Sequence, residues 1–380
     1  MTRPAGCAAL CGALWGLAVA AGLAGGQAAP PAPADAYLKL TAPWPDAETM
    51  QRRQIEAETR PLFAASDPLV VTFTADFTAV NKDRDPNSTR RFPGVLAVTA
   101  ADGSMASTRV SLGTRGKARL NIRTCDVVPL RVDFVEGPPK GTMFEGQESL
   151  KVVTHCRDSS AYQRYVPREY LVYRIFNLHT PASFRATLAK ATYVDSSSGR
   201  TTAGRHAIFL EDPDDVARRL NGRSVDLPHV PYRDLDLDAT TRLALVQYLI
   251  ANTDYDVNVP HNIRIVQDQA RRLIPVAYDF DVSGLVNAHY AGVDPALGIA
   301  SARDRLYRGP CRTAAELEPL LAQMRAKKAE VLALYDSLPE LDTGSRREAR
   351  AFLEQFYTTI ARPDRIRKAF IDGCGKHIAM

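Results

Sequence analysis

The sequence has few cysteines and histidines and no large excess of charge of one sign. Its 380 residues include 6 cysteines and 7 histidines, with no CxxC spacing, so a structural zinc site is not expected. The formal net charge of +5 is small, and no nucleic-acid-binding signature accompanies it. The motifs Gly-x-Ser-x-Gly and His-Glu-x-x-His are also missing, which disfavours the common hydrolase classes.

Residues 1–28 have the pattern of a secretory signal peptide. Arg3 precedes an apolar stretch over residues 7–24, and small residues at 26–28 suit a signal peptidase. An uncleaved anchor is the alternative, although the stretch is short and weakly apolar for one. No later stretch reaches 18 apolar residues, so we expect a secreted or periplasmic mature chain with no transmembrane segment. Residues 29–64 would form a spacer or extended N-terminal segment.

Four cysteines remain after the leader: Cys125, Cys156, Cys311 and Cys374. An even number in an exported protein favours disulfides, and four cysteines allow three pairings. We favour Cys125–Cys156 and Cys311–Cys374, because each pair joins neighbouring parts of the chain. Buried free thiols are the alternative.

Hydrophobic periodicity divides the remaining chain into two regions. Residues 65–222 are rich in alternating, β-branched segments, with a hairpin signal at Asp102-Gly103 and one helix over 168–178 after Pro167. Residues 223–380 are mainly helical, with a helix over 239–251 and a capping box at Thr313 and Glu316. A hairpin around residues 267–272 interrupts the helices. These patterns indicate an α+β protein.

The polar loop NTDYDVNVPHNIRI, residues 252–265, stands between an apolar helix and an apolar strand. Asp254, Asp256 and Asn258 begin like a calcium loop, but Val259 takes the glycine position and Ile265 the final glutamate position, so an EF-hand is not expected. A plain loop rich in turn residues is a second interpretation. The third is a phosphoryl-transfer loop, since a hairpin after it would return an acidic turn to its side.

Several segments carry a family resemblance. ANTDYDVNVPHN and YDFDVSG, with TRG, FEGQESLKVVTHC, SFRATL and RDRLYRG, resemble a group of largely uncharacterised exported bacterial proteins. The loop and acidic turn of that group are similar to those of the atypical kinases of the spore-coat CotH type, and more distantly of HipA-like kinases. The resemblance implies a bilobal protein-kinase-like fold, with a β-rich N-terminal lobe over 65–222 and a mainly helical C-terminal lobe over 223–380.

The resemblance also implies an activity. It would be Mg²⁺- and ATP-dependent phosphoryl transfer to an unknown protein or small-molecule acceptor, with no nucleic-acid partner. The alternative is a catalytically inactive kinase-like binding module of the cell envelope. The two differ in whether bound nucleotide is turned over.

The resemblance assigns roles to eight side chains. Asp254 would be the catalytic carboxylate, and the magnesium ligands would be Asn262, Asp279 and Asp281. The groups on the nucleotide side would be Lys151 at the phosphates, Glu169 as its partner, Arg115 in the basic turn and Glu211 at the hinge.

Departures from the kinase pattern affect these roles. The loop is longer than in protein kinases, which leaves open whether Asp254 or Asp256 acts. Asp281 replaces the glycine of a DFG motif, and the basic turn GTRGKAR is not a glycine-rich phosphate loop.

Overall fold

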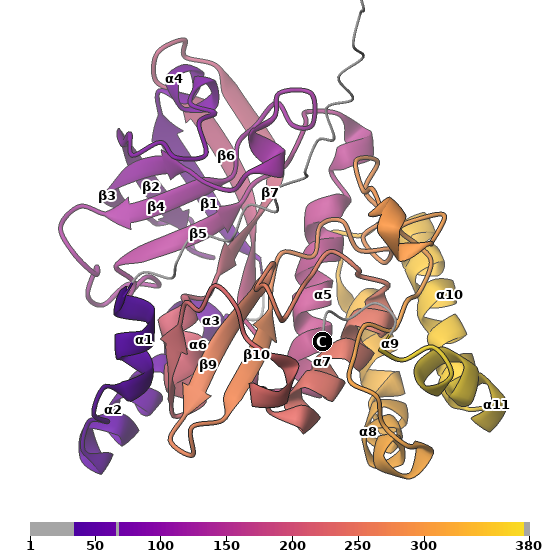
Figure 1. Cartoon of the computed structure of the whole chain (residues 1–380). Coiled ribbons are helices and arrows are strands. Elements are labelled where there is room, and N and C mark those ends of the chain that lie inside the picture. Colours follow the sequence, from indigo (N-terminus) through magenta and orange to yellow (C-terminus); the bar gives the residue numbers. More distant parts are fainter. Residues whose placement is uncertain (1–33, 66–67, 376–380) are drawn as a thin grey trace, which may run out of the picture. The chain divides into compact units, whose positions relative to one another are not determined.

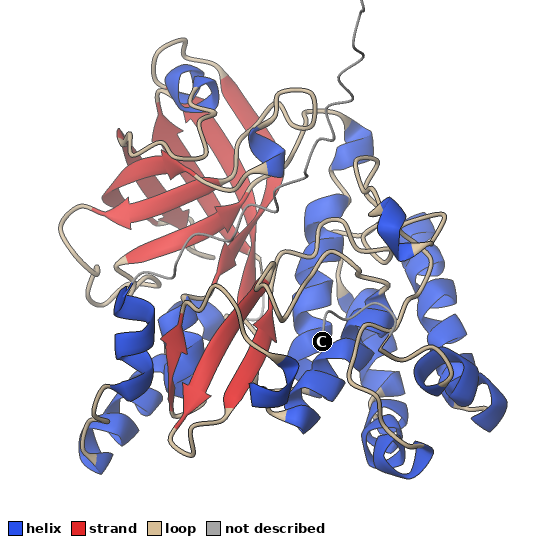
Figure 2. Cartoon of the chain, viewed as in Figure 1, coloured by secondary structure: helices blue, strands red, loops and turns tan. Residues whose placement is uncertain are grey.

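Seven strands of the N-terminal half close into a barrel (Figures 1 and 2). In this computed structural model, which describes residues 34–65 and 68–375, the barrel order is β1-β2-β3-β4-β5-β7-β6. The strands are β1 (Leu69–Ala75), β2 (Phe92–Thr99), β3 (Met105–Thr114), β4 (Leu130–Phe134), β5 (Ser149–Val153), β6 (Ala186–Asp195) and β7 (Thr201–Leu210). The expected signal peptide lies outside the described residues.

The barrel closes because β1 pairs in parallel with β6, with Phe73 opposite Tyr193. The remaining pairs are antiparallel, and β2 and β3 form the hairpin expected at Asp102-Gly103. Alternate side chains of the strands point inward, so that Val71, Phe73 and Leu96 are fully buried. The barrel therefore has its own apolar interior.

A second, three-stranded sheet has the order β10-β9-β8. Its strands are β8 (Gly222–Val225), β9 (Ile263–Asp268) and β10 (Leu273–Ala277). Helices accompany the two sheets: α1 (Ala34–Thr41), α2 (Ala47–Glu58), α3 (Pro61–Ala64), α4 (Phe77–Lys82), α5 (Tyr165–His179), α6 (Pro213–Arg219), α7 (Leu237–Ile250), α8 (Ala314–Ala326), α9 (Lys328–Ser337), α10 (Thr343–Ile360) and α11 (Pro363–Ile366). Figure 1 shows α7 to α11 gathered on one side of this sheet.

The expected bilobal protein-kinase-like fold is wrong. The β-rich region is a closed seven-stranded barrel rather than an open lobe sheet, and the C-terminal region contains a separate sheet beside its helices. Local patterns gave the strands, but closure depends on a pairing between segments more than a hundred residues apart. Between β3 and β4, Ala118–Leu120 forms a 3-10 turn.

Helix α5 connects the two parts of the core. It packs against β6 and β7 of the barrel and against α7 and α9. Twelve of its fifteen residues are buried, which explains why its sequence shows little amphipathic contrast.

Two disulfides join Cys125 to Cys156 and Cys311 to Cys374, the pairing favoured from the sequence. Such bonds fit an oxidising environment. Within the described residues, no helix has the length and apolar character needed to cross a membrane.

Candidate functional site

The polar loop after α7 folds back on itself. Ala251 takes a left-handed conformation that ends the helix, and the Asn252 side chain accepts a hydrogen bond from the Asp254 N–H. Asp256 and His261 then exchange both backbone hydrogen bonds, at 3.0 and 2.9 Å. This closed turn absorbs the extra loop residues and brings Asp254 beside Asn262.

The Asp254 carboxylate faces the amide of Asn262 at the far end of the loop. Its Oδ2 accepts a hydrogen bond from Asn262 Nδ2 at 3.0 Å, and its Oδ1 lies 3.0 Å from His261 Nε2. The hydrogen bond to Asp254 raises the pKa of His261. The other candidate, Asp256, accepts from the N–H groups of Asn258 and Val259, so it holds the turn together. Asp254 therefore faces Asn262, whereas Asp256 is engaged within its own turn.

The β9–β10 hairpin returns the acidic turn to this loop. Tyr278 N–H donates to the Asn262 carbonyl at 3.0 Å, so Asp279 follows directly beside Asn262. Asn262 and Asp279 both have positive φ, 52° and 65°, a conformation that costs energy in non-glycine residues. The N–H of Asp279 donates to the Tyr173 hydroxyl on α5 at 3.1 Å, which fixes the turn against that helix.

Three carboxylates meet where the acidic turn contacts α5. Burial and the neighbouring Asp279 raise the pKa of Asp281 to about 7. Burial, Asp281 and Asp279 raise the pKa of Glu169 far above its usual value, although Glu169 accepts a hydrogen bond from the Phe280 backbone. We name Glu169, Asp279 and Asp281, with Asp254 at the edge, the acidic cluster. Uncompensated negative charge in a low dielectric is the setting in which a cation binds well.

A buried guanidinium, that of Arg119, lies beside the acidic cluster. Burial lowers its pKa, but Tyr290, Asp281 and Glu169 raise it above its usual value. Its Nη2 donates to the Thr154 carbonyl at 2.5 Å, and no salt bridge within 4.0 Å joins it to a carboxylate among the described residues. Arg119 therefore offsets part of the cluster's charge from a short distance.

A basic group stands on the barrel side of the same turn. Burial, with Arg115 and then Arg264, lowers the pKa of Lys151 to about 8. The Lys151 and Arg264 side chains both lie over the Tyr278 ring, at 6.0 and 5.5 Å. Tyr278 directly precedes Asp279 in the sequence, so these cations contact the residue next to the acidic cluster. We name Lys151, Arg115 and Arg264 the basic cluster.

Two expected roles on the nucleotide side look different in the structure. Among the described residues, Lys151 and Glu169 form no salt bridge. Glu169 instead faces the acidic turn. Glu211 is fully buried and is bound at 2.7 and 2.8 Å by Arg185 and Arg219. With both oxygens engaged, Glu211 holds the base of the barrel to α6 and has no capacity left for a ligand.

The donor atoms suit Mg²⁺ better than a softer metal. Carboxylate and amide oxygens are the ligands that Mg²⁺ prefers, and the Asp279 carboxylate has no hydrogen-bond or ion-pair partner in the described part of the chain. Asn262 donates through its nitrogen, which leaves its oxygen free to coordinate. Across residues 34–65 and 68–375, no three His, Cys, Asp or Glu side chains are already arranged as a metal site. The residues therefore match Mg²⁺ in the type of their donor atoms. Their carboxylates would have to rotate to coordinate the ion.

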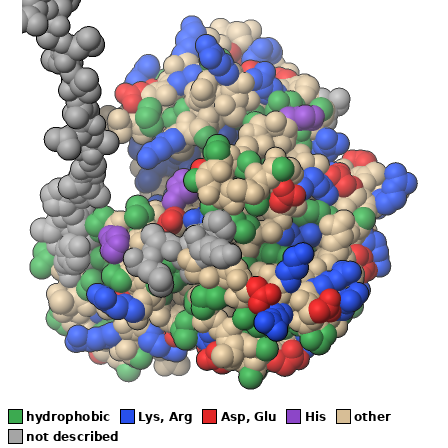
Figure 3. Space-filling model, turned by 45° about the vertical axis from the view of Figure 1, so that its right-hand side comes forward, with side chains coloured by type: hydrophobic (Ala, Val, Ile, Leu, Met, Phe, Trp, Pro, Cys, Tyr) green, Lys and Arg blue, Asp and Glu red, His purple; other side chains and the backbone are tan. Residues whose placement is uncertain are grey.

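Sequence reasoning overlooked Arg119, Arg264, Tyr173 and Tyr290. Arg119 is the last residue of the basic turn GTRGKAR and lies in a 3-10 turn. Its signal was a basic residue just before the Cys125 disulfide, which holds the turn at the base of β5. On the face drawn in Figure 3, Lys and Arg side chains are interspersed with acidic ones, so surface charge alone does not mark the site.

Comparison with protein-family models and with curated proteins gives no match to this chain.

Proposed function

We propose that the chain is an exported, Mg²⁺- and ATP-dependent phosphotransferase acting on an unidentified protein or small-molecule acceptor. The observation that carries the proposal is the adjacency of the acidic and basic clusters on the two sides of Tyr278. Phosphoryl transfer needs both a place for a cation and donors for phosphate oxygens. The proposed export rests on the leader pattern of residues 1–28 and on the two disulfides.

Each cluster would have a separate role. Lys151 and Arg115 would bind phosphate oxygens. The lowered pKa of Lys151 leaves part of the Lys151 amines neutral near pH 7, and a bound anion would raise that pKa and protonate them. Asn262, Asp279 and Asp281 would hold Mg²⁺, which supplies charge neutralisation on the phosphates. Asp254, oriented by Asn262 and His261, would accept the proton of the acceptor hydroxyl.

Arg119 favours the second candidate, an inactive nucleotide- or ion-binding module. A permanent cation beside Asp281 and Glu169 reduces the attraction of the cluster for Mg²⁺. Such a module would bind ATP without turning it over.

The test is transfer of the γ-phosphate of ATP to the protein itself, to casein or to water. We expect Mg²⁺-dependent turnover that Asp279→Ala lowers by about a hundredfold or more, as when a charge-stabilising group is removed. The matched control Asp336→Ala removes an exposed carboxylate on α9 and should be fully active. ATP binding without turnover would favour the inactive module. Equal turnover by Asp279→Ala and wild type would overturn the assignment.

A further inference from the structure

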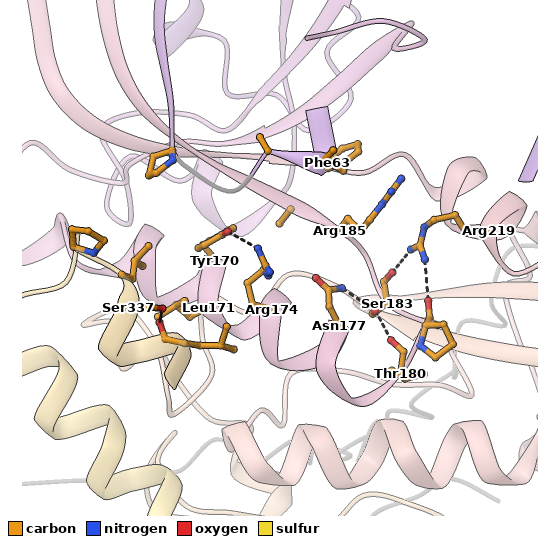
Figure 4. A pocket seen from close by; sticks show the side chains of 18 residues that line it. Phe63, Tyr170, Leu171, Arg174, Asn177, Thr180, Ser183, Arg185, Arg219 and Ser337 are labelled. Atoms are coloured by element: carbon orange, nitrogen blue, oxygen red, sulfur yellow. Dashed lines mark hydrogen bonds between the residues drawn. The ribbon is translucent and has the colours of Figure 1, made fainter. Parts of the chain in front are cut away.

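A second cavity, separate from the acidic and basic clusters, lies between α5, α9 and the N-terminal end of β6. Its volume is about 550 Å³, within the range of small-molecule pockets. Figure 4 shows Tyr170, Arg174 and Asn177 projecting from α5, with Phe63 and Arg185 across the space. Apolar side chains from α3, α5 and the end of α9 complete the wall: Phe63, Leu171, Leu334 and Leu338.

Two of the three arginines that line this cavity share one buried carboxylate. Arg185 and Arg219 both bind Glu211, and Arg219 also donates to the Ser183 carbonyl. Their remaining N–H groups are largely taken by backbone carbonyls of the α2 end and of Pro181. With Glu211 these two side chains keep one net positive charge, but most of their N–H donors are already engaged.

Arg174 is different. It is half-buried, and its recorded partner is the Tyr170 hydroxyl, 3.0 Å from Nη1. Within residues 34–65 and 68–375, no carboxylate lies within 4.0 Å of it. A guanidinium carries five N–H donors, so most of its hydrogen-bonding capacity is unused at the wall of a cavity. A partly desolvated cation of this kind binds an anion more strongly than an exposed one does.

We propose that this cavity binds a small organic anion. Its oxyanionic head, a carboxylate or a phosphate monoester, accepts hydrogen bonds from Arg174. The Asn177 amide and the Ser337 hydroxyl already donate within the protein, so Arg174 is the donor on which the proposal rests. Its apolar body packs against Phe63, Leu334 and Leu338. An anion with an apolar body matches a lining in which guanidinium groups and apolar side chains are mixed.

The cavity is distinct from the phosphotransferase site, although α5 contributes to both. Glu169, Tyr173 and Phe176 follow each other at helical spacing and face the acidic turn. Tyr170, Arg174 and Asn177 repeat at the same spacing one position later, on the adjacent face. The inference therefore does not depend on the proposed function.

The experiment titrates the disulfide-bonded protein with benzoate, phenyl phosphate and neutral benzyl alcohol, by ligand-observed NMR and calorimetry. We expect one or both anions to bind, and benzyl alcohol to bind about tenfold more weakly or not at all. Arg174→Gln, which can still donate to Tyr170, should weaken anion binding about tenfold or more, and Arg174→Lys should recover part of it. Benzoate and phenyl phosphate together distinguish a carboxylate site from a phosphate site.

Two controls separate this result from folding and from the other site. Arg347→Gln removes an exposed guanidinium on α10 and should bind like wild type, and Asp279→Ala should also leave anion binding unchanged. Unchanged thermal unfolding of Arg174→Gln establishes that its fold is intact. The proposal is overturned if neither anion binds, if benzyl alcohol binds equally well, or if folded Arg174→Gln retains the wild-type affinity.

Discussion

Gly284 is the residue at which the acidic turn comes closest to α7. Its N–H donates to the Ala251 carbonyl at 2.9 Å, where the helix ends in a left-handed residue. A Cβ at this position would lie 2.5 Å from the Ala302 carbonyl oxygen and 2.9 Å from Ala251 Cβ. The final glycine of the DFDVSG segment is thus required by packing between backbones.

Gly284→Ala should therefore destabilise the protein by about 1–3 kcal/mol, the usual cost of overpacking. The free energy of unfolding in urea measures it. Gly292→Ala is the matched control, since a Cβ there meets no atom within 4 Å and should change stability little. Equal stabilities for the two variants would contradict the close approach of the turn to α7.

His179, at the end of α5, gives a pH dependence whose sign can be worked out. Burial, together with Arg242 and Lys327, lowers its pKa from 6.5 to about 4. The unfolded chain then binds a proton between these two values that the folded chain does not. Stability from this group is therefore present above pH 6.5 and is lost as the pH falls toward 4.

Between pH 7 and pH 5, this group should remove about 2 kcal/mol of stability, at about 1.4 kcal/mol per pH unit below 6.5. Glutamine has no proton to gain in this pH range. The free energy of unfolding of His179→Gln should therefore fall by about 2 kcal/mol less than that of wild type between pH 7 and pH 5. Unfolding in urea at both pH values measures the difference, with the exposed His229→Gln as control. A variant as acid-sensitive as wild type would refute the buried neutral histidine.

At the scale of elements, short sequence patterns correctly predicted the turns and helix caps that depend on neighbouring residues. The Asp102-Gly103 hairpin, the hairpin around residues 267–272 and the capping box at Thr313 are all confirmed, because turn and capping residues act over a few positions. Barrel closure was missed, since β1 and β6 pair across more than a hundred residues of intervening chain, which no local pattern reports. Within the site, Asp254, Asn262, Asp279 and Asp281 converge, but their neighbour Arg119 arrives from a distant turn that no short pattern links to them.

Phe280 joins the acidic turn to α5. It is fully buried, and its ring lies 4.8 Å from those of Phe176 and Tyr173. Phe280→Ala should cost about 3–5 kcal/mol, as removal of a buried aromatic ring leaves a cavity. Calorimetric unfolding measures the loss, and Phe280→Leu should recover part of it. A cost below about 1 kcal/mol would show that the turn is not anchored to this helix.

At the scale of the whole molecule, the barrel region supplies Lys151 and Arg115 of the basic cluster, and β9 of the small sheet supplies Arg264. The turn after β10 and helix α5 supply most of the acidic cluster. The β5 strand carries Lys151, the turn after β3 carries Arg115, and the β9–β10 hairpin ends at Asp279. The Cys125–Cys156 disulfide joins the segment that follows Arg119 to the residues that follow β5. A ligand bridging both clusters would therefore contact elements from both halves of the chain.

The most direct measurement is calorimetric titration of a non-hydrolysable ATP analogue, with and without Mg²⁺. It is made on three proteins: wild type, Lys151→Met and Asp279→Ala. If the clusters form one site, the analogue binds wild type and Mg²⁺ strengthens the binding. Lys151→Met should weaken binding about tenfold or more with or without the ion, whereas Asp279→Ala should remove the Mg²⁺ effect alone. Absence of binding to wild type, or identical binding by all three folded proteins, would contradict the account.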